Sequence, residues 1–257
     1  MTMIIAGHWR AMNPVIREYK RYVDKLPPEA DGYRIAIISD VHLSVTMNEK
    51  WFNKNVDRIN ALNPDLILLV GDVLDETYKD AEWVVKPLRR FKATDGVWAS
   101  TGNHDFYYGI DSFMYLMREA GINVLRNEAA IVADKIILGA VDDKTATDLL
   151  KVERVPIAAI VDEFKHRLPI VFMNHTPNRR EEAEKLNVEV YISGHTHHGQ
   201  LWPLGYITET FYSIKTGIQD ENGMLFIHST GLGTWGPPMR INATPEIILV
   251  VLKSPER

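Results

Sequence analysis

The chain has 257 residues, of which 46% are hydrophobic and 25% are charged, and its formal net charge is -5 at pH 7. This composition is typical of a soluble globular protein, and the negative charge leaves no basic surface for a nucleic-acid polymer, so such a partner is not expected. Cysteine is absent, which excludes disulfides, thiolate metal sites and cysteine nucleophiles. No apolar run reaches the roughly 18 residues that a membrane span needs.

The first 34 residues are compatible with two structures. Apolar residues within 15–26 recur at helical spacing. The same stretch also fits an edge strand that carries many charges, with Val15, Tyr19 and Val23 on one face. Proline and glycine residues within 27–32 then turn the chain.

Two short apolar runs, residues 35–38 and 66–70, predict strands that are buried on both faces. Segment 48–63 between them has one apolar face and predicts an amphipathic helix. This order is the strand–helix–strand crossover of a parallel sheet. Because such sheets bind ligands beyond the carboxyl ends of their strands, the residues that follow each run are candidates for a site.

Acidic and histidine side chains follow both runs. Asp40 and His42 come after the first, and alternate residues of an extended segment point the same way, so both can reach one ion. Asp72 and Asp75 come after Gly71 and the second run. Charges at the end of a buried strand are costly unless a cation compensates them. For each motif alone, a solvated turn or a helix N-cap is the simpler interpretation.

The next segment has the same organisation. Residues 79–91 and 110–120 predict helices, and residues 97–99 predict a strand that is followed by Asn103 and His104. An amide oxygen can bind a metal, and a histidine can either bind a metal or transfer a proton. With three strand ends carrying polar clusters, coincidental helix caps become a poor explanation.

The middle of the chain is expected to link two halves. Residues 135–141 predict a strand, and the two aspartates at 142–143 are interpreted as turn carboxylates. Segment 145–167 is expected to be a mobile link with a helix near 157–164, and His166 on its charged flank is expected to be solvated.

Histidines follow two further strands in the second half. His175 follows the first strand, and three histidines lie after the second. His195 and His197 have the alternate spacing that lets both rings face one cavity, whereas His198 points the other way. Three histidines within four positions are hard to explain as packing. The elements predicted here are strands at 169–173 and 188–192 and a helix at 178–186.

The last part of the chain is aromatic and rich in turns. Residues 202–219 predict a hairpin at the rim of a site, and strands are expected at 224–227 and 246–252. The Gly/Pro-rich loop 231–238 is either a tight turn or a lip over the site, and we favour the turn. Arg240 is a candidate for meeting a phosphate, but a surface ion pair is the preferred interpretation.

Eight polar side chains thus follow the predicted strands: Asp40, His42, Asp72, Asn103, His104, His175, His195 and His197. Oxygen and imidazole ligands without sulfur suit Mn, Fe or Zn. The set is too large for one tetrahedral ion, so two divalent ions that share a carboxylate fit better. Such pairs of ions catalyse the hydrolysis of phosphoesters and peptides.

The order of the motifs closely resembles that of the calcineurin-like metallophosphoesterase family. The motifs are Asp-x-His at 40–42, Gly-Asp-x-x-Asp at 71–75, Gly-Asn-His-Asp at 102–105, a single histidine at 175 and Gly-His-x-His at 194–197. The resemblance implies an α/β fold of two packed mixed β-sheets flanked by helices, a four-layer α/β/β/α sandwich with a dinuclear centre at one edge. It implies that one metal is held by Asp40, His42, Asp72 and His197. It implies that the other is held by Asp72, Asn103, His175 and His195.

The resemblance also implies a reaction. A hydroxide shared by the two metals would attack phosphorus, and His104 would protonate the leaving group. Asp75 would orient His104, with a structural helix cap as the alternative for this residue. The expected reaction is hydrolysis of a phosphodiester or a pyrophosphate. The alternatives are a phosphomonoesterase, a dinuclear peptidase, and a metal-stabilised binding module without turnover, against which the non-ligand His104 argues.

A finer resemblance is to a bacterial branch that carries a membrane-anchored phosphodiesterase-like domain. It implies that residues 1–33 form an N-terminal segment with an edge strand, which follows a membrane anchor absent from this chain, and that residues 34–257 form the catalytic domain. The expected localisation is at a membrane, with a soluble cytoplasmic protein as the alternative, and the expected substrate is lipid-linked or contains a nucleotide. His198 replaces a glycine that is common in the branch, which affects the substrate inference and not the metals. The matching stretches are 13–19, 199–203, 231–240 and 245–247.

Overall fold

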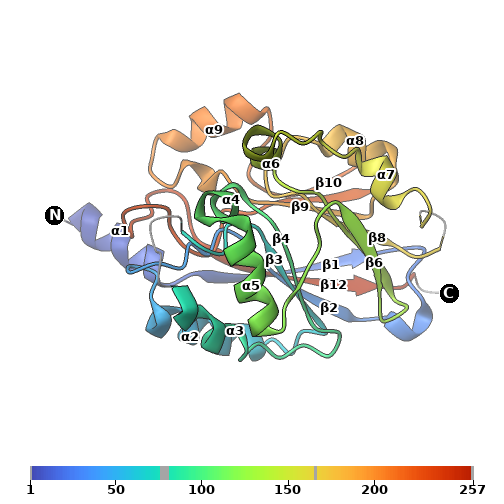
Figure 1. Cartoon of the computed structure of the whole chain (residues 1–257), viewed down its shortest axis with the longest axis horizontal. Helices are drawn as coiled ribbons and strands as arrows, with labels where there is room; N and C mark the ends of the chain where they lie inside the picture. Colours follow the sequence, from blue (N-terminus) through green and yellow to red (C-terminus); the bar gives the residue numbers. More distant parts are fainter. Residues whose placement is uncertain (1, 76–80, 165–166, 256–257) are drawn as a thin grey trace.

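Two mixed β-sheets pack face to face, and helices cover both outer faces (Figure 1), which gives the predicted four layers in the order α/β/β/α. The computed structural model describes residues 2–75, 81–164 and 167–255. The predicted His166 lies outside these described residues.

The first sheet contains six strands in the order β1-β12-β2-β3-β4-β5. Strands β2 to β5 are parallel, whereas β12 runs antiparallel to β2 and parallel to β1. The strands are β1 (Val15–Tyr22), β2 (Tyr33–Ile38), β3 (Leu66–Val70), β4 (Val97–Ser100), β5 (Asn123–Val124) and β12 (Glu246–Lys253).

The second sheet also contains six strands, in the order β10-β11-β9-β8-β7-β6. Strands β7, β8, β9 and β11 are parallel, and the two edge strands pair antiparallel with their neighbours. The strands are β6 (Glu128–Val132), β7 (Ile136–Ala140), β8 (Ile170–Met173), β9 (Val190–Ser193), β10 (Gly217–Glu221) and β11 (Met224–His228).

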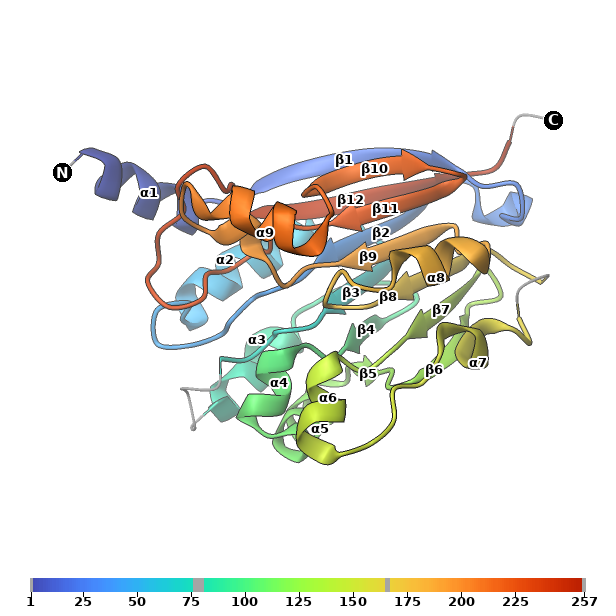
Figure 2. The same ribbon diagram turned by 90° about the horizontal axis from the view of Figure 1, so that it is seen from above.

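Helices α2, α3 and α5 cover the outer face of the first sheet, and α7 and α8 cover that of the second. Figure 2 shows α4 and α9 at one end of the sheets and the C-terminus at the other. The helices are α1 (Thr2–Met12), α2 (Glu49–Asn60), α3 (Val85–Leu88), α4 (Asn103–Tyr108), α5 (Ile110–Ala120), α6 (Lys144–Leu150), α7 (Ile157–Val161), α8 (Arg180–Lys185) and α9 (Leu204–Tyr212), with 3₁₀ turns at Pro28–Ala30, Ala81–Val84 and His197–Gly199.

Strand β3 shows why the buried apolar runs form the centre of the fold. Leu66, Leu68 and Val70 pack between the two sheets, whereas Ile67 and Leu69 pack against the helices. Successive side chains of a strand point to opposite faces, so a strand that is covered on both sides must be apolar at every position.

Residues 15–22, which follow helix α1, form the predicted edge strand and not the helix that was the alternative. Strand β1 pairs with β12 over its whole length, from Val15 opposite Glu246 to Tyr22 opposite Lys253. An edge strand tolerates charged side chains because one of its sides remains in water, which explains its charged sequence.

Two predictions of local structure were wrong. Residues 202–219 do not form a hairpin, because helix α9 occupies half of this segment and only β10 is extended. The link after β7 differs from the prediction as well, because it begins with helix α6. Asp143 caps this helix by accepting a hydrogen bond from the Thr145 amide at 2.9 Å.

Candidate metal centre

The residues predicted to bind metal lie together past the carboxyl ends of β2, β3, β4, β8 and β9, where both sheets contribute to one edge. They are Asp40, His42, Asp72, Asn103, His104, His175, His195 and His197. Parallel strands place their carboxyl ends on the same side of a sheet, so short loops suffice to bring these side chains together.

One group of potential ligands consists of Asp40, His42 and His197, whose ligand atoms all lie within 4.8 Å of one another. The two Nε2 atoms of His42 and His197 are 3.0 Å apart, and Nε2 of His197 lies 3.4 Å from Oδ1 of Asp40. The three side chains are buried.

A second group consists of Asp72, His175 and His195. Nε2 of His175 lies 3.0 Å from Oδ2 of Asp72. Asn103 joins this group, because its Oδ1 lies 2.8 Å from Nδ1 of His195. The second ligand set implied by the resemblance is therefore assembled in one place.

Asp72 connects the two groups. Its Oδ2 is 3.8 Å from Nε2 of His42, and Asp72, His42 and His104 form a third group within the same 4.8 Å limit. His104 thus lies as close to the potential ligands as they lie to one another. The arrangement fits two cations that share the Asp72 carboxylate.

The ring of His175 is buried and is oriented as a metal ligand would be. Nδ1 of His175 lies 2.8 Å from the Val70 carbonyl oxygen, which fixes the ring with Nε2 directed at Asp72. A histidine that donates one ring N–H to a carbonyl and presents the other nitrogen is typical of metal ligands.

Three of the histidines are held in the neutral form that binds metals. Burial lowers the pKa of His42 to about 3 and that of His195 to about 4. Burial and the nearby Arg240 guanidinium lower the pKa of His197. These rings are therefore neutral at pH 7, which is the form of histidine that binds metals.

The buried carboxylates need positive charge. Burial raises the pKa of Asp40 to about 6. Burial also opposes ionisation of Asp72, but the neighbouring His175 lowers its pKa. Burial disfavours the protonated ring of His175, yet the carboxylates of Asp72 and Asp40 raise its pKa well above the usual value. A divalent cation between these side chains would supply the same positive charge.

Five of the candidate ligands have strained backbone conformations. The prediction that their side chains converge because they alternate along extended segments was therefore wrong. Asp40, His42, Asp72, His195 and His197 all have positive φ, between 49° and 74°, so these segments are left-handed and not extended. Such conformations cost on the order of 1–3 kcal/mol each and persist where the surrounding structure fixes them. The side chains converge through these tight turns and not through strand alternation.

Two glycines of the motifs are required by close approach. Gly71 has φ of 73°, and a Cβ there would collide with the ring of His175. A Cβ on Gly194 would collide with Oδ2 of Asp40. Each glycine therefore allows one loop to pass directly beside a candidate ligand from another loop.

Arg240 does not form the surface ion pair that was preferred from the sequence. Its side chain is fully buried, and its guanidinium donates to Nδ1 of His197 at 2.8 Å, to the His197 carbonyl oxygen at 3.0 Å and to the Gly233 carbonyl oxygen at 3.2 Å. Arginine suits this position because its planar fork offers several donors in fixed directions. It holds the His197 ring in place.

Two further residues support the site without having been singled out from the sequence. The Tyr212 hydroxyl, on α9, lies 2.9 Å from Nε2 of His195. The buried Asp105 accepts hydrogen bonds from the amides of Asp72 at 2.9 Å and Val73 at 3.1 Å. The motif that ends in Asp105 was visible in the sequence, but the loop that the Asp105 carboxylate binds was not.

The aspartates after β7 brace the loops, in agreement with their interpretation as turn carboxylates. Asp142 accepts from the Arg126 guanidinium at 2.8 Å and from the Thr101 hydroxyl at 3.0 Å. Asp143 accepts from the Thr176 hydroxyl and caps α6.

A cavity of about 430 Å³ opens beside the metal centre. Its wall includes His42, Asp72, His104 and, from the Gly/Pro-rich loop, Trp235. Through Trp235 the loop 231–238 forms part of a lip over the site, in addition to the structural turn that was preferred from the sequence. His198 is not part of this wall, and its Nδ1 lies 3.1 Å from the Thr216 hydroxyl.

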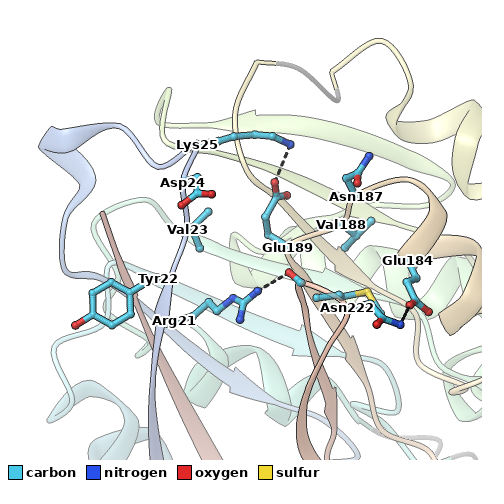
Figure 3. Close-up of a pocket in the computed structure, with 12 residues that line it drawn as sticks. Arg21, Tyr22, Val23, Asp24, Lys25, Glu184, Asn187, Val188, Glu189 and Asn222 are labelled. Carbon is cyan, nitrogen blue, oxygen red and sulfur yellow. Dashed lines mark hydrogen bonds and ion pairs between the residues drawn. The ribbon is translucent and has the colours of Figure 1, made fainter. Parts of the chain in front are cut away.

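A second cavity, of about 390 Å³, lies at the opposite ends of the strands (Figure 3). Lys25 forms an ion pair with Glu189 at 2.8 Å, and Asn222 donates to Glu184. Arg21 donates to the Gly223 carbonyl oxygen. Because these polar groups bind one another, we assign no ligand to this cavity.

Comparison with known proteins agrees with this geometry. The family model for calcineurin-like phosphoesterases matches residues 33–199. A protein of Aquifex aeolicus named an uncharacterized metallophosphoesterase is 30% identical over 243 residues, which are 93% of this chain and 91% of that protein. A Danio rerio protein named a transmembrane protein with metallophosphoesterase domain is also 30% identical, over 95% of this chain and 58% of its own length.

The fold is shared with a solved structure of a dimetal phosphatase from Danio rerio, with a TM-score of 0.52 and 14% identity over 81% of this chain and 90% of that one. None of the helices in the described residues is long and apolar enough to cross a membrane. The extent of the family match, together with the full-length similarity to the Aquifex aeolicus protein, shows that this chain belongs to the calcineurin-like phosphoesterase family.

Proposed function

We propose that this chain is a metal-dependent phosphoesterase with a dinuclear centre, and that it hydrolyses phosphodiesters or pyrophosphates. The observation that supports this most directly is the overlap of three potential ligand groups at His42 and Asp72, beside an open cavity. Hydrolysis adds water across a P–O bond and releases an alcohol or a phosphate together with the phosphoryl product.

The proposed ligands follow from the distances described above. Asp40, His42, Asp72 and His197 would hold one cation, and Asp72 would share its carboxylate with a second cation held by Asn103, His175 and His195. Oxygen and imidazole donors suit Mn, Fe or Zn. Two divalent cations, when bound, polarise the phosphoryl oxygens and lower the pKa of a water molecule.

His104 is proposed to protonate the leaving oxygen. It lines the cavity, and its amide donates to Oδ1 of Asp72 at 2.8 Å. Its ring contacts the rings of His42 and Trp235 edge-on, with centroids 4.7 Å and 6.3 Å apart. These contacts hold the ring over the space where a phosphoester would bind. Asp75, which is buried in the loop after β3, is proposed to orient it.

The charge of the cavity favours a diester over a monoester. The described residues that line it include no Lys or Arg. A phosphomonoester carries up to two negative charges at neutral pH, and a phosphodiester carries one. A site whose cationic charge comes from metals alone therefore suits the substrate with less charge, which also favours the phosphodiester over the pyrophosphate.

The test compares two diesters and two histidine variants in the presence of Mn²⁺. We expect wild-type protein to hydrolyse bis(p-nitrophenyl) phosphate, and EDTA to abolish the activity. A general acid matters most for a poor leaving group, so His104→Ala should slow hydrolysis of diphenyl phosphate by about 10²–10⁴ and affect the nitrophenyl ester less.

His198→Ala is the matched control, because this histidine lies in the same motif region and outside the cavity wall. It should keep the wild-type rates on both esters. An equal loss on both esters in His104→Ala would instead indicate that His104 binds metal. Faster turnover of p-nitrophenyl phosphate than of either diester would identify a phosphomonoesterase.

We also propose that the protein acts at a membrane, with residues 34–257 as the catalytic domain and β1 as its edge strand. The name of the Danio rerio relative supports this. Helix α1 exposes the large apolar side chains of Ile4, Ile5 and Trp9, which would suit a lipid surface. Sedimentation with phosphatidylglycerol vesicles tests it, because binding should fall when Ile4 and Ile5 are both replaced by Ser.

A further inference from the structure

One wall of the cavity beside the metal centre is largely apolar, unlike the wall formed by the candidate metal ligands. One stripe of helix α9 lines it, formed by Leu204, Ile207, Thr208 and Tyr212. Ile207 and Thr208 lie three and four residues after Leu204, and Tyr212 lies four residues after Thr208, so all four share one face of the helix. Trp235 lines the cavity as well.

The apolar side chains of this wall are exposed to solvent. The exposed fractions are 44% for Leu204, 62% for Ile207 and 58% for Trp235. Exposed apolar side chains that are contiguous with a polar site typically mark a surface for a ligand. Their position beside the metal centre distinguishes them from isolated surface residues.

The wall is held in place at both ends. The Tyr212 hydroxyl lies 2.9 Å from Nε2 of His195, which joins the end of α9 to the metal centre. Gln200 binds the backbone of Trp235 twice, because its Nε2 donates to the carbonyl oxygen at 2.8 Å and its Oε1 accepts from the amide at 2.9 Å. The apolar surface therefore begins at the candidate ligands and extends along a fixed helix.

We propose that the substrate is amphiphilic, with its phosphoester at the metal centre and an apolar substituent along α9 against Leu204, Ile207 and Trp235. This inference rests on the proposed phosphoesterase function. The absence of Lys and Arg among the described lining residues also leaves additional phosphates of a nucleotide without partners. The ligand class is an ester of phosphate with a hydrophobic alcohol, either a membrane lipid or a free amphiphile.

The test uses p-nitrophenyl alkyl phosphodiesters with methyl, butyl, hexyl and octyl groups, below their micelle concentrations and with Mn²⁺ present. We expect kcat/KM to rise about twofold to fourfold for each methylene that the wall covers. Ile207→Gln and Leu204→Gln should flatten this dependence. Tyr206→Gln is the control, because Tyr206 is 63% exposed on the same helix and does not line the cavity, so it should keep both the rates and the dependence.

A wild-type enzyme that hydrolyses the methyl ester but shows no dependence on chain length would overturn the inference and leave the phosphoesterase function intact. Calorimetric titration of the Mn²⁺-loaded protein with dimethyl and dihexyl phosphate tests the wall without turnover. Equal affinity for the two would overturn the inference even if no ester is hydrolysed. Loss of a dimer in Ile207→Gln together with a flat dependence would assign the wall to a second copy of the chain.

The source of the amphiphile is distinguished by presenting the octyl ester in phosphatidylcholine vesicles. Turnover at or above the rate of the free ester supports a membrane lipid. Turnover confined to the free ester supports a soluble amphiphile. Both results support the apolar wall.

Discussion

Arg240 shows how a single residue outside the motifs can control a ligand. A buried guanidinium is costly unless its donors are satisfied, and burial lowers the pKa of Arg240 to about 10. Here the donors bind His197 and the carbonyl oxygen of Gly233, and these hydrogen bonds offset the cost of burial. They also hold the His197 ring against the Gly/Pro-rich loop.

Replacement of Arg240 by Met should therefore weaken both stability and metal binding. The carbonyl oxygens of His197 and Gly233 would lose their donors, at a cost of about 2–4 kcal/mol in the free energy of unfolding. Loss of a residue that positions a ligand typically lowers metal affinity by about 10–100-fold. Urea unfolding in EDTA and Mn²⁺ titration measure the two effects.

Arg240→Lys should recover only part of the loss, because an ammonium cannot reproduce the planar fork. Arg89→Met is the control, since this exposed arginine pairs with Glu119 at 3.8 Å and should change stability by about 1 kcal/mol or less. Unchanged Mn²⁺ affinity in Arg240→Met would contradict the positioning of His197 by Arg240.

His228 should make stability depend on pH in the acid range. It is buried, its Nε2 lies 2.8 Å from the Thr196 hydroxyl, and burial lowers its pKa to about 4, with His195 and His198 also disfavouring its charge. The unfolded chain binds a proton near pH 6.5 and the folded chain only near pH 4. Stability from this residue is therefore complete above pH 6.5 and is lost as the pH falls toward 4.

The expected loss between pH 7.5 and 5 is about 2 kcal/mol in wild-type protein, and His228→Gln should lack it. Urea unfolding at both pH values, in metal-free buffer, gives the difference between the two proteins. Other buried histidines titrate in both proteins and cancel in this comparison. Equal pH dependence would show that His228 does not remain neutral in the folded chain.

The sequence was sufficient to predict the candidate ligands but not the residues that hold them. The ligands follow strands that are recognisable from short apolar runs, such as Asp72 after β3. Arg240 lies 43 residues from His197 along the chain, so no local pattern connects the two. The positive φ of Asp40 and His42 was also hidden, because tertiary contacts impose it against the residues' own preference.

At the scale of elements, Asp105 couples the loop after β3 to the start of α4. Its Oδ2 accepts from the amides of Asp72 at 2.9 Å and Gly102 at 2.8 Å, and its Oδ1 accepts from Val73 and Leu74 at 3.1 Å and 3.3 Å. One carboxylate thus satisfies four backbone donors and fixes the turn that presents Asp72 to both groups of ligands.

Asp105→Asn should disrupt this coupling although the side chains have nearly the same shape. The amide group of Asn would face backbone N–H donors, and leaving two of them unpaired should cost about 3 kcal/mol. Because Asp72 moves with its loop, Mn²⁺ affinity should fall as well. Urea unfolding measures the loss of stability. Titration with Mn²⁺, at a temperature at which the variant is still folded, measures the loss of affinity. Asp111→Asn, an exposed change in the first turn of α5, should leave both quantities near wild type.

Elements that are buried on both faces were predicted best, because hydrophobicity alone defines them. Strand β3 has the predicted bounds. Helix α5, which buries only one face, also has the predicted bounds, because Gly121 with φ of 76° terminates it. Helix α9 was missed because its aromatic and β-branched residues lie over a cavity and not over a core. Its exposed face removes the apolar–polar contrast on which the prediction of an amphipathic helix depends.

For the whole molecule, the site depends on how the two sheets pack. Asp40, His42, Asp72 and Asn103 follow strands of the first sheet, whereas the histidines at 175–197 follow strands of the second. The apolar layer between the sheets therefore sets the distance across which a metal would be shared. A cation bound at Asp72 would in turn join the two sheets at their edge, so metal binding and global stability should be linked.

This linkage predicts that metals raise the melting temperature. A ligand at 100 times its dissociation constant adds about 2.7 kcal/mol, which corresponds to roughly 5–10 °C for a chain of this size. We expect Mn²⁺ to produce such a shift and EDTA to remove it. Asp72→Asn should abolish the shift, because it removes the carboxylate that both groups share.

The metal-free variant should be less stable than metal-free wild type, because Asp72→Asn removes the buried carboxylate that pairs with His175 at 3.0 Å. The Mn²⁺ shift is therefore measured against each protein's own metal-free melting temperature, which separates loss of a ligand from general damage to the fold. His198→Ala should retain the full shift with Mn²⁺. A shift of equal size in Asp72→Asn would mean that the cation binds elsewhere, and the shared carboxylate would then not be the centre of the site.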